Sequence, residues 1–365
     1  MLVGMTIDAN LLKECCDAHG VSGHEGEVRN VFRRVLGRMG EVATAGAGNI
    51  VCERAGAWPR VMLAAHMDEI GFLVQSVGED GFLSIVPIGG WWNHTLLSQK
   101  VVVKTRSGRK VRGVIGSKPP HFLPENQRNS VLPIEALFVD VGAASADEVA
   151  EQGIALGDPV APGVELEAFD MPHRWVGKAF DNRAGFYAML EVMRGLEGCE
   201  LPNTLIAAGT VQEEVGTRGA RTVGELAEMD CAIVLEGPPA DDTPGFAGSG
   251  RQGVLGKGAQ VRMYDPTAIM NPALVELVRR TAEENGIPFQ MTVRRSGGTD
   301  AGALQFVGPG VPCVVIGVPT RYIHAHHGVL DDRDLQAVID LTMALVKKLD
   351  AAAVVSLTDY ESLDA

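Results

Sequence analysis

Hydrophobic positions along this chain follow two different periods, which predict helices in some segments and strands in others. Between residues 8 and 39 apolar side chains recur every three or four positions, as on the buried face of a helix, first at Leu11, Leu12, Cys15 and Cys16 and then at Val28, Val31, Phe32 and Val35. We therefore expect two helices at the start of the fold. The alternation of helical and strand-like segments later in the chain predicts further helices over 183–196, 219–228 and 335–349.

Short uninterrupted apolar runs alternate with these helices. Runs of this kind are typical of central strands buried on both faces of a sheet, and they occupy residues 50–52, 61–65, 204–210 and 231–235. Strands that alternate with helices form an α/β domain.

The segment between residues 73 and 166 has a different pattern of apolar and turn-forming residues. Its short apolar stretches are separated by turn signals such as Glu79-Asp80-Gly81 and Gly89-Gly90. We expect this block to form a small β-rich barrel or sandwich. The chain is thereby divided into one α/β domain, formed by residues 1–72 and 168–365, and an inserted β-rich domain of residues 73–167.

Composition and charge narrow the classes of partner and compartment. The chain has 365 residues, of which 46% are hydrophobic, so it can bury sizeable cores. Its 46 acidic and 32 basic residues give a net charge of -14, which argues against nucleic acid or an anionic membrane as principal partner. No stretch reaches the ~20 apolar residues of a membrane span. The six cysteines are scattered, as in a protein of the reducing cytoplasm, where we expect this one.

The adjacent carboxylates Glu213 and Glu214 follow the apolar run 204–210 directly. Neighbouring residues at the end of a strand point to opposite sides, so one carboxylate can bind a metal ion while the other handles a proton on its water. Taken alone, such a doublet is more often a pair of solvated acids. The buried strand before it and the glycine that follows favour a functional site.

Further metal-binding side chains lie after other apolar runs or at helix starts. His66 follows the run 61–65, and Asp68 could hydrogen-bond its second ring nitrogen. Asp181 precedes a predicted helix, where the alternative is a helix cap. Glu236 ends the run 231–235, where the alternative is a loop carboxylate, and His324 lies in a later loop. Because open α/β sheets build their sites at the carboxyl ends of the strands, we expect these residues to meet.

Charge balance supports a centre with two metal ions. Two divalent ions carry four positive charges, and Asp181, Glu214 and Glu236 with one hydroxide supply four negative ones. Two imidazoles and three carboxylates could hold such ions about 3.5–4 Å apart. This chemistry predicts hydrolysis of an amide.

Eight motifs in this order resemble the M42 family of metalloaminopeptidases, whose members form tetrahedral particles. They span nearly the whole chain and occupy residues 21–25 (Val-Ser-Gly-His-Glu), 66–72, 116–121, 153–158, 180–183 (Phe-Asp-Asn-Arg), 212–216 (Gln-Glu-Glu-Val-Gly), 297–301 and 319–324. The resemblance implies a three-layer α/β/α di-zinc exopeptidase domain with an inserted PDZ-like β-barrel that forms dimers.

The resemblance also implies roles for individual residues. Asp181 would bridge the ions, with His66 and Glu236 completing one site and Glu214 and His324 the other. Glu213 would be the general base, and Asp68 would orient His66. The expected cofactors are two ions of Zn²⁺ or Co²⁺, with Mn²⁺ as a further candidate. The expected partners are peptide substrates and copies of the same chain, in a dodecamer built from dimers.

Two departures from the family pattern keep alternatives open. The family usually has aspartate where this chain has Glu236, and it reads Ser-Pro-x-Glu where this chain has Ala325-His326-His327-Gly328. His326 or His327 could be a substitute ligand, a substrate contact or an exposed loop residue. The alternatives for the whole protein are a dipeptidase, a carboxypeptidase, an N-acyl-amino-acid deacylase, or a scaffolding protein that has lost the chemistry.

Three further features of the sequence could contribute to the site or to association. Arg321 could attract acidic substrates, but the family motif contains this arginine regardless of specificity. Thr299 and Asp300 resemble a substrate-side segment of the family, with a turn and a capping aspartate as the alternative, so no catalytic role is assigned to them. Trp91 and Trp92, in the inserted domain, fill its core or form an association surface, and the local sequence favours the core.

Overall fold

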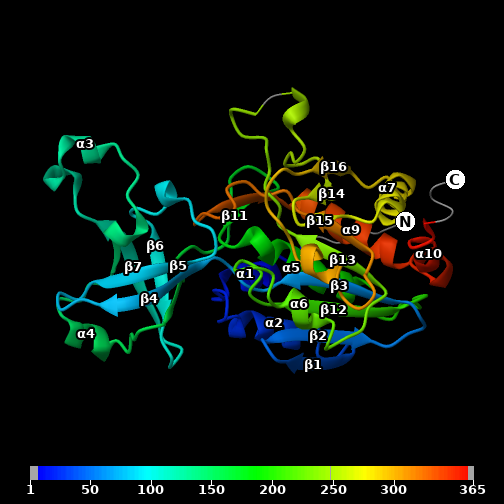
Figure 1. The fold of residues 1–365 in the computed structure, drawn as a ribbon, viewed down its shortest axis with the longest axis horizontal. Helices are drawn as coiled ribbons and strands as arrows, with labels where there is room; N and C mark the ends of the chain where they lie inside the picture. Colours follow the sequence, from blue (N-terminus) through cyan, green and yellow to red (C-terminus); the bar gives the residue numbers. More distant parts are fainter. Residues whose placement is uncertain (1–6, 247, 361–365) are drawn as a thin grey trace.

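The computed structural model describes residues 7–246 and 248–360. Figure 1 shows them as two parts of unequal size. The larger part contains the first and the last elements of the chain, and the smaller part is the segment drawn in cyan and blue-green. The chain therefore leaves the larger part, builds the smaller one, and returns.

A mixed β-sheet forms the centre of the larger part. Its strands in sheet order are β1 (Glu41–Ala45), β2 (Asn49–Arg54), β12 (Thr204–Thr210), β3 (Arg60–His66), β13 (Cys231–Glu236), β17 (Cys313–Gly317), β14 (Ala259–Asp265) and β15 (Ala268–Ile269), and β16 (Phe289–Val293) pairs with β14. The four neighbours β12, β3, β13 and β17 run parallel. Their carboxyl ends consequently meet at one edge of the sheet.

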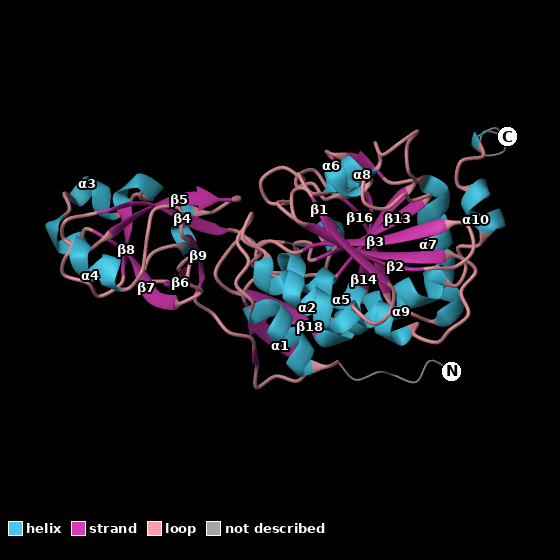
Figure 2. Cartoon of the chain, turned by 90° about the horizontal axis from the view of Figure 1, so that it is seen from below, coloured by secondary structure: helices cyan, strands magenta, loops and turns pink. Residues whose placement is uncertain are grey.

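Helices cover both faces of this sheet, as Figure 2 shows. In that view α6 and α8 lie above the strands, and α1, α2, α5 and α9 lie below them. The helices of this part are α1 (Ala9–Asp17), α2 (Gly26–Leu36), α5 (Phe180–Gly195), α6 (Ala220–Val223), α7 (Pro272–Asn285), α8 (Ala301–Leu304), α9 (Asp332–Val346) and α10 (Ala351–Ser356). Every position of β12 and β13 is buried between these layers. This is the three-layer α/β/α arrangement that the family resemblance implies.

Most predicted elements of this part are present, and one is wrong. The predicted strand 204–210 is β12, and the predicted helices 183–196 and 335–349 are α5 and α9 with shifted ends. The predicted helix 219–228 ends at Val223. Beyond it the amides of Glu225 and Leu226 bond carbonyls three residues back, so the chain tightens into turns at Gly224.

The smaller part is a closed β-barrel with its own hydrophobic core. Its strands around the barrel are β4 (Gly71–Val77), β5 (Leu83–Ile88), β8 (Leu137–Asp140), β7 (Lys110–Ser117), β6 (Lys100–Lys104) and β9 (Pro159–Pro162), and its connections contain α3 (Glu125–Arg128) and α4 (Ala146–Glu151). The short apolar stretches and turn signals of residues 73–166 predict a barrel or a sandwich, and the barrel is confirmed. The predicted limits of the insertion, 73–167, stay a prediction.

A small sheet and an aromatic cluster lie where the two parts meet. The sheet joins β10 (Glu167–Ala168), β11 (Arg174–Gly177) and β18 (Gly328–Asp331). Trp91 stacks on Phe72 with ring centroids 4.8 Å apart and contacts His326 at 5.2 Å. Trp91 is therefore partly buried and packs against the core of the barrel, whereas Trp92 is 65% exposed. Within the described residues, no helix has the length and apolar character needed to cross a bilayer.

Candidate metal centre

Three neighbouring parallel strands bring three parts of the site to one edge of the sheet. His66 is the last residue of β3 and Glu236 is the last residue of β13. Thr210, the last residue of β12, pairs with His66, so Glu213 and Glu214 follow at the same edge. The sequence predicts this convergence because each residue ends an apolar run.

Asp181 reaches the site from the start of α5, where its backbone is not helical (φ -86°, ψ 103°). The helix cap is the next residue, because the amide of Gly185 donates to Asn182 Oδ1 at 3.1 Å. The alternative in which Asp181 caps the helix is therefore wrong. Its carboxylate is left to face the two histidines of the site.

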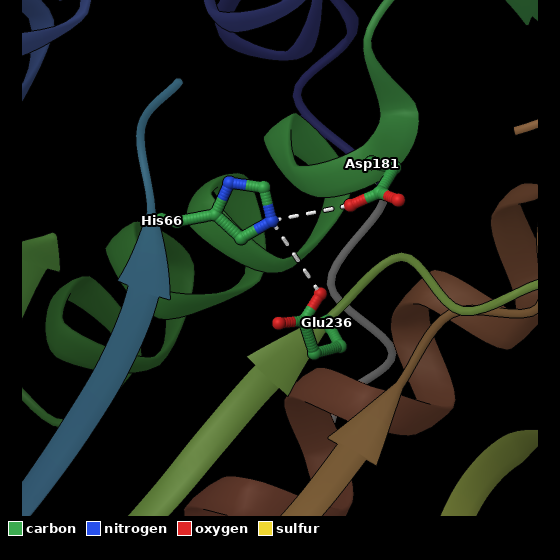
Figure 3. A group of neighbouring side chains, drawn as sticks. All are labelled: His66, Asp181 and Glu236. Carbon is green, nitrogen blue, oxygen red and sulfur yellow. Dashed lines mark hydrogen bonds and ion pairs between the residues drawn. The ribbon is translucent and has the colours of Figure 1, made fainter. Parts of the chain in front are cut away.

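The first group of possible metal donors consists of His66, Asp181 and Glu236, shown in Figure 3. His66 Nε2 lies 3.1 Å from Asp181 Oδ1 and 3.8 Å from Glu236 Oε2. Glu236, where the chain departs from the family pattern, thus reaches this group with its longer side chain.

The second group consists of Asp181, Glu214 and His324. His324 Nε2 lies 3.4 Å from Asp181 Oδ2 and 3.3 Å from Glu214 Oε2. The two oxygens of Asp181 therefore face different imidazoles, so that one carboxylate belongs to both groups. Glu213 belongs to neither group, although its Oε2 is 3.9 Å from His66 Nε2.

Asp68 connects His66 with the segment that carries the glutamate pair. Its Oδ1 lies 3.4 Å from His66 Nδ1 and accepts the amide of Glu213 at 3.0 Å. Its Oδ2 accepts the amide of Glu214 at 3.2 Å and the hydroxyl of Ser22 at 2.6 Å. Asp68 is fully buried and thus holds both sides of the site. The hydrophobic pattern and the metal-binding residue types do not single out Ser22, which the sequence marks only as part of the motif 21–25.

A loop of the barrel supports the second group. His324 Nδ1 donates to the carbonyl oxygen of Gly90 at 2.8 Å, which leaves Nε2 to face Asp181 and Glu214. The sequence could not predict this contact, because it joins residues 234 positions apart through a backbone atom.

Several residues that flank the site have left-handed backbone conformations that non-glycine residues rarely adopt. They are Ala179, Gln212, Tyr322 and His324, with φ between 55° and 60°. Such conformations persist where the surrounding structure enforces them, and they cluster at functional sites.

Burial and mutual repulsion disturb the acid–base properties of the carboxylates. Burial raises the pKa of Glu214 and of Glu236 to about 8 and raises that of Glu213 well above its usual range. Burial also acts to raise the pKa of Asp181, but hydrogen bonds from the two imidazoles hold it below its usual value. Burial acts to lower the pKa of His324, yet its contacts with Asp181 and Glu214 raise it to about 9. The carboxylates are therefore crowded in a way that bound cations would relieve.

The other histidines of the loop after His324 lie outside both donor groups. His326 is buried against Trp91, and neither of its ring nitrogens has a hydrogen-bond partner within the described residues. Burial lowers the pKa of His326 to about 4, so its ring packs as a neutral aromatic group. His327 is exposed.

Arg321 and Asp300 serve the loops around the site. Arg321 binds both carboxylate oxygens of Asp242, at 2.6 and 2.7 Å, and so has its own internal partner. Asp300 is buried and accepts the hydroxyl of Thr210 at 2.5 Å. No side-chain cap bond is present at the start of α8, so the capping alternative for Asp300 is wrong.

Comparison with known proteins now identifies the family. The model of the family described as M42 glutamyl aminopeptidase matches residues 48–341. The chain belongs to this family. A shorter match, to a model described as AMPT, covers residues 6–32. The resemblance seen in the motifs is thereby confirmed, and with it a peptidase family whose members remove N-terminal residues.

Relatives within the M42 family differ in their named preference. A glutamyl aminopeptidase of Lactococcus lactis is 35% identical, over 96% of this chain and 98% of its own length. A lysyl aminopeptidase of Pyrococcus furiosus is 34% identical, over 94% of this chain and 98% of its own length.

Solved structures of the M42 type share the fold. A TET aminopeptidase from a marine sediment archaeon of the Thaumarchaeota superposes with a TM-score of 0.93 at 38% identity, covering 96% of this chain and 98% of that one. The TET1 peptidase of Pyrococcus horikoshii, which can assemble into a tetrahedron or a large octahedral shell, has a TM-score of 0.83 at 30% identity, covering 93% and 99%.

Proposed function

We propose that this M42 protein is an aminopeptidase that uses two divalent metal ions held by His66, Asp181, Glu214, Glu236 and His324. The observation that carries the proposal is the position of Asp181, whose two oxygens face the imidazoles of two separate donor groups. A carboxylate in this position can bridge two ions.

The donor set fits divalent transition metals. Imidazole nitrogens and carboxylate oxygens suit Zn²⁺ and Co²⁺, with Mn²⁺ as a further candidate. When bound, such ions supply Lewis acidity to the scissile carbonyl and lower the pKa of water. They would also neutralise the carboxylates whose pKa is raised by burial in the metal-free protein.

Glu213 is proposed as the general base. It lies beside the donor groups but belongs to neither, so its carboxylate is available to accept a proton from the attacking water. The same group would then deliver that proton to the amine of the leaving peptide. Asp68 would keep Glu213 in place through its backbone amide, at 3.0 Å, while it orients His66.

Self-association through the barrel is part of the proposal. The barrel segment carries large apolar side chains that are exposed in the single chain, namely Trp92, Leu97, Phe122 and Val131. Large apolar side chains on the surface are suited to burial in an interface between copies of the chain. Since the Pyrococcus horikoshii relative forms closed shells, we propose a dodecamer built from dimers. Native mass spectrometry of the purified protein tests this assembly.

The reaction is tested with metal-stripped protein and a panel of peptides with free or acetylated N-termini. After addition of Zn²⁺, Co²⁺ or Mn²⁺ we expect release of single residues from free N-termini only. Equal cleavage of the acetylated peptides would instead indicate a deacylase, and release from the other end a carboxypeptidase. Fewer than one bound ion per chain together with no cleavage would favour a scaffolding protein.

A further inference from the structure

The motif 21–25 contains a buried glutamate that belongs to neither donor group. Glu25 is only 2% exposed and stands at the N-cap position of α2, yet among the described residues its side chain caps none of the free amides of that helix. Burial and the nearby charge of Asp68 raise the pKa of Glu25. Because a buried carboxylate is costly unless it is paired, its position indicates a contact that offsets this cost.

The carboxylate of Glu25 reaches the segment that carries the glutamate pair. Its Oε1 accepts the amide of Gln212 at 3.2 Å and the amide of Gly23 at 2.7 Å. Its Oε2 lies 4.0 Å from Nη2 of Arg29, beyond hydrogen-bond distance, and the Nε of Arg29 donates to the carbonyl oxygen of Gly48 at 2.8 Å. Glu25 is therefore held by backbone amides, and Arg29 contributes only a more distant charge.

Three successive amides just after β12 donate to buried carboxylates. The amide of Gln212 donates to Glu25, and those of Glu213 and Glu214 donate to the two oxygens of Asp68 at 3.0 and 3.2 Å. The charges of Asp68 and Glu25 repel each other, and the hydrogen bonds from the amides offset this repulsion. The two carboxylates thus hold adjacent parts of one turn.

Gln212 is the residue at which this turn is set. Its φ is 55°, in the left-handed region that residues other than glycine rarely adopt. Such a conformation persists where the surrounding contacts enforce it. Glu25 fixes the peptide plane before Gln212, and Asp68 fixes the plane after it through the amide of Glu213. Together the two contacts determine φ and ψ of Gln212.

The direction of the Glu213 side chain depends on this turn. Among the described residues, no group donates a hydrogen bond to the carboxylate of Glu213, whose Oε2 lies 3.9 Å from His66 Nε2. Glu214 differs, because it belongs to a donor group in which a bound ion would hold its carboxylate. Glu213 therefore relies on its backbone for its direction.

We propose that Glu25 is a positioning residue for the general base: the hydrogen bond that it accepts from Gln212 sets the turn that directs Glu213 toward the attacking water. The inference rests on the proposed function, in which Glu213 takes a proton from that water. Displacement of a reacting group by about 1 Å can reduce a rate ~100-fold. Loss of the contact should therefore slow the proton transfer and leave both ions bound.

Three substitutions of Glu25 separate the hydrogen bond from the charge. Glu25→Gln removes the charge but keeps an acceptor oxygen, so kcat should stay within about threefold of the wild type. Glu25→Asp keeps the charge but is one methylene shorter and would withdraw from Gln212, so kcat should fall roughly 10- to 100-fold. Glu25→Met keeps the length without the acceptor and should lose as much; Glu25→Asp decides alone if Glu25→Met does not fold. If Glu25→Asp kept its kcat and Glu25→Gln lost it, the charge would be decisive and the proposal would be overturned.

The assay measures kcat and KM for a peptide with a free N-terminus, and plasma mass spectrometry counts the bound ions. In each variant we expect two ions per chain and a KM within about twofold of the wild type, so that the loss lies in kcat. Glu225→Met, at an exposed position after α6, is the matched control. If Glu25 only supported the fold, its variants would lose stability and bound metal while kcat per metal-loaded site stayed constant. That result would overturn the proposal.

A double substitution shows whether Glu25 acts through the base. In protein that already carries Glu213→Gln, Glu25→Asp should change the residual kcat by less than about twofold, because the group that Glu25 positions is no longer there. A further loss as large as in the wild-type background would mean that Glu25 acts on the metal centre or on the fold. The proposal would then be wrong.

Hydrogen exchange tests the contact without any measurement of activity. Exchange of the Gln212 amide, followed at single-residue resolution by mass spectrometry, should be slow in the wild type and in Glu25→Gln and at least ~10-fold faster in Glu25→Asp. Equal exchange in Glu25→Asp and the wild type would overturn the inference whatever the activity. If exchange rises as expected but no peptide is cleaved with any metal, the proposed function fails and with it the role of Glu25 in hydrolysis, while the contact itself stands.

Discussion

Replacement of Asp68 by asparagine would change the charge at the point where both sides of the site are held. The carboxylate of Asp68 faces His66 Nδ1 and accepts hydrogen bonds from the amides of Glu213 and Glu214 and from the hydroxyl of Ser22. Asparagine has one acceptor oxygen in place of two. Its NH2 group would take the place of the other oxygen and would face groups that are themselves hydrogen-bond donors. The variant must therefore lose at least one of these bonds.

The size of the effect follows from the burial of Asp68. Each hydrogen bond to a buried charged group contributes about 1.5–3 kcal/mol. With one or two bonds lost, we expect the free energy of unfolding of the metal-free protein to fall by about 2–4 kcal/mol. Because loss of the partner of a metal-binding histidine costs roughly 10- to 100-fold in affinity, the ion bound by His66 should be held that much more weakly.

Two assays measure these changes. Urea unfolding in the presence of a chelator gives the stability, and competition with a chromogenic chelator gives the metal affinity. Asp147→Asn, at an exposed position of α4, is the matched control. An Asp68→Asn protein with unchanged metal affinity and stability within about 0.5 kcal/mol of the wild type would refute this account of Asp68.

Three further predictions concern the release of protons on metal binding, the ion pairs of Glu27 with two lysines of the barrel, and the barrel loop at Gly90. Glu214 and Glu236, with pKa raised to about 8, are largely protonated at pH 7 without metal. Metal binding should therefore release protons, and the metal affinity should increase as the pH rises. Calorimetry in buffers of different ionisation enthalpy measures the number of protons released. Metal binding without proton release would contradict the assignment of Glu214 and Glu236 as ligands. Burial acts to raise the pKa of Glu27, but its two lysine partners on the barrel lower it to about 2, against a usual value of 4.5. The ion pairs that lower this pKa stabilise the fold fully above about pH 4.5, so Glu27→Gln should reduce the free energy of unfolding by about 1 kcal/mol at pH 7. The difference between variant and wild type should shrink as the pH falls from about 4.5 to about 2. A difference that stays constant over this range in urea unfolding would contradict the prediction. A methyl group at Gly90 would lie 3.2 Å from His324 Nδ1, so Gly90→Ala should weaken binding of the second ion several-fold, and two equally tight ions in a metal titration would argue against this contact.

The sequence predicts the parts of the site that depend on regular strands. His66 and Glu236 end uninterrupted apolar runs, and such runs become adjacent parallel strands whose ends meet. The glutamate pair after β12 follows from the same rule. These residues could therefore be placed together before any contact was known.

Contacts made by backbone atoms and loops could not be predicted in the same way. The support of His324 by Gly90 depends on how the barrel sits against the α/β domain, and a carbonyl oxygen leaves no signal in the sequence. The capping role of Asn182 depends on a local backbone conformation that helical spacing does not reveal.

The central claim is that Glu213 transfers protons at a centre whose ions are held by other residues. Glu213→Gln tests it most directly, because the amide keeps the shape of the side chain and removes the base. We expect two ions per chain by plasma mass spectrometry, unchanged thermal stability, and a kcat for peptide hydrolysis reduced at least ~100-fold. Turnover close to that of the wild type, with both ions bound, would contradict the account.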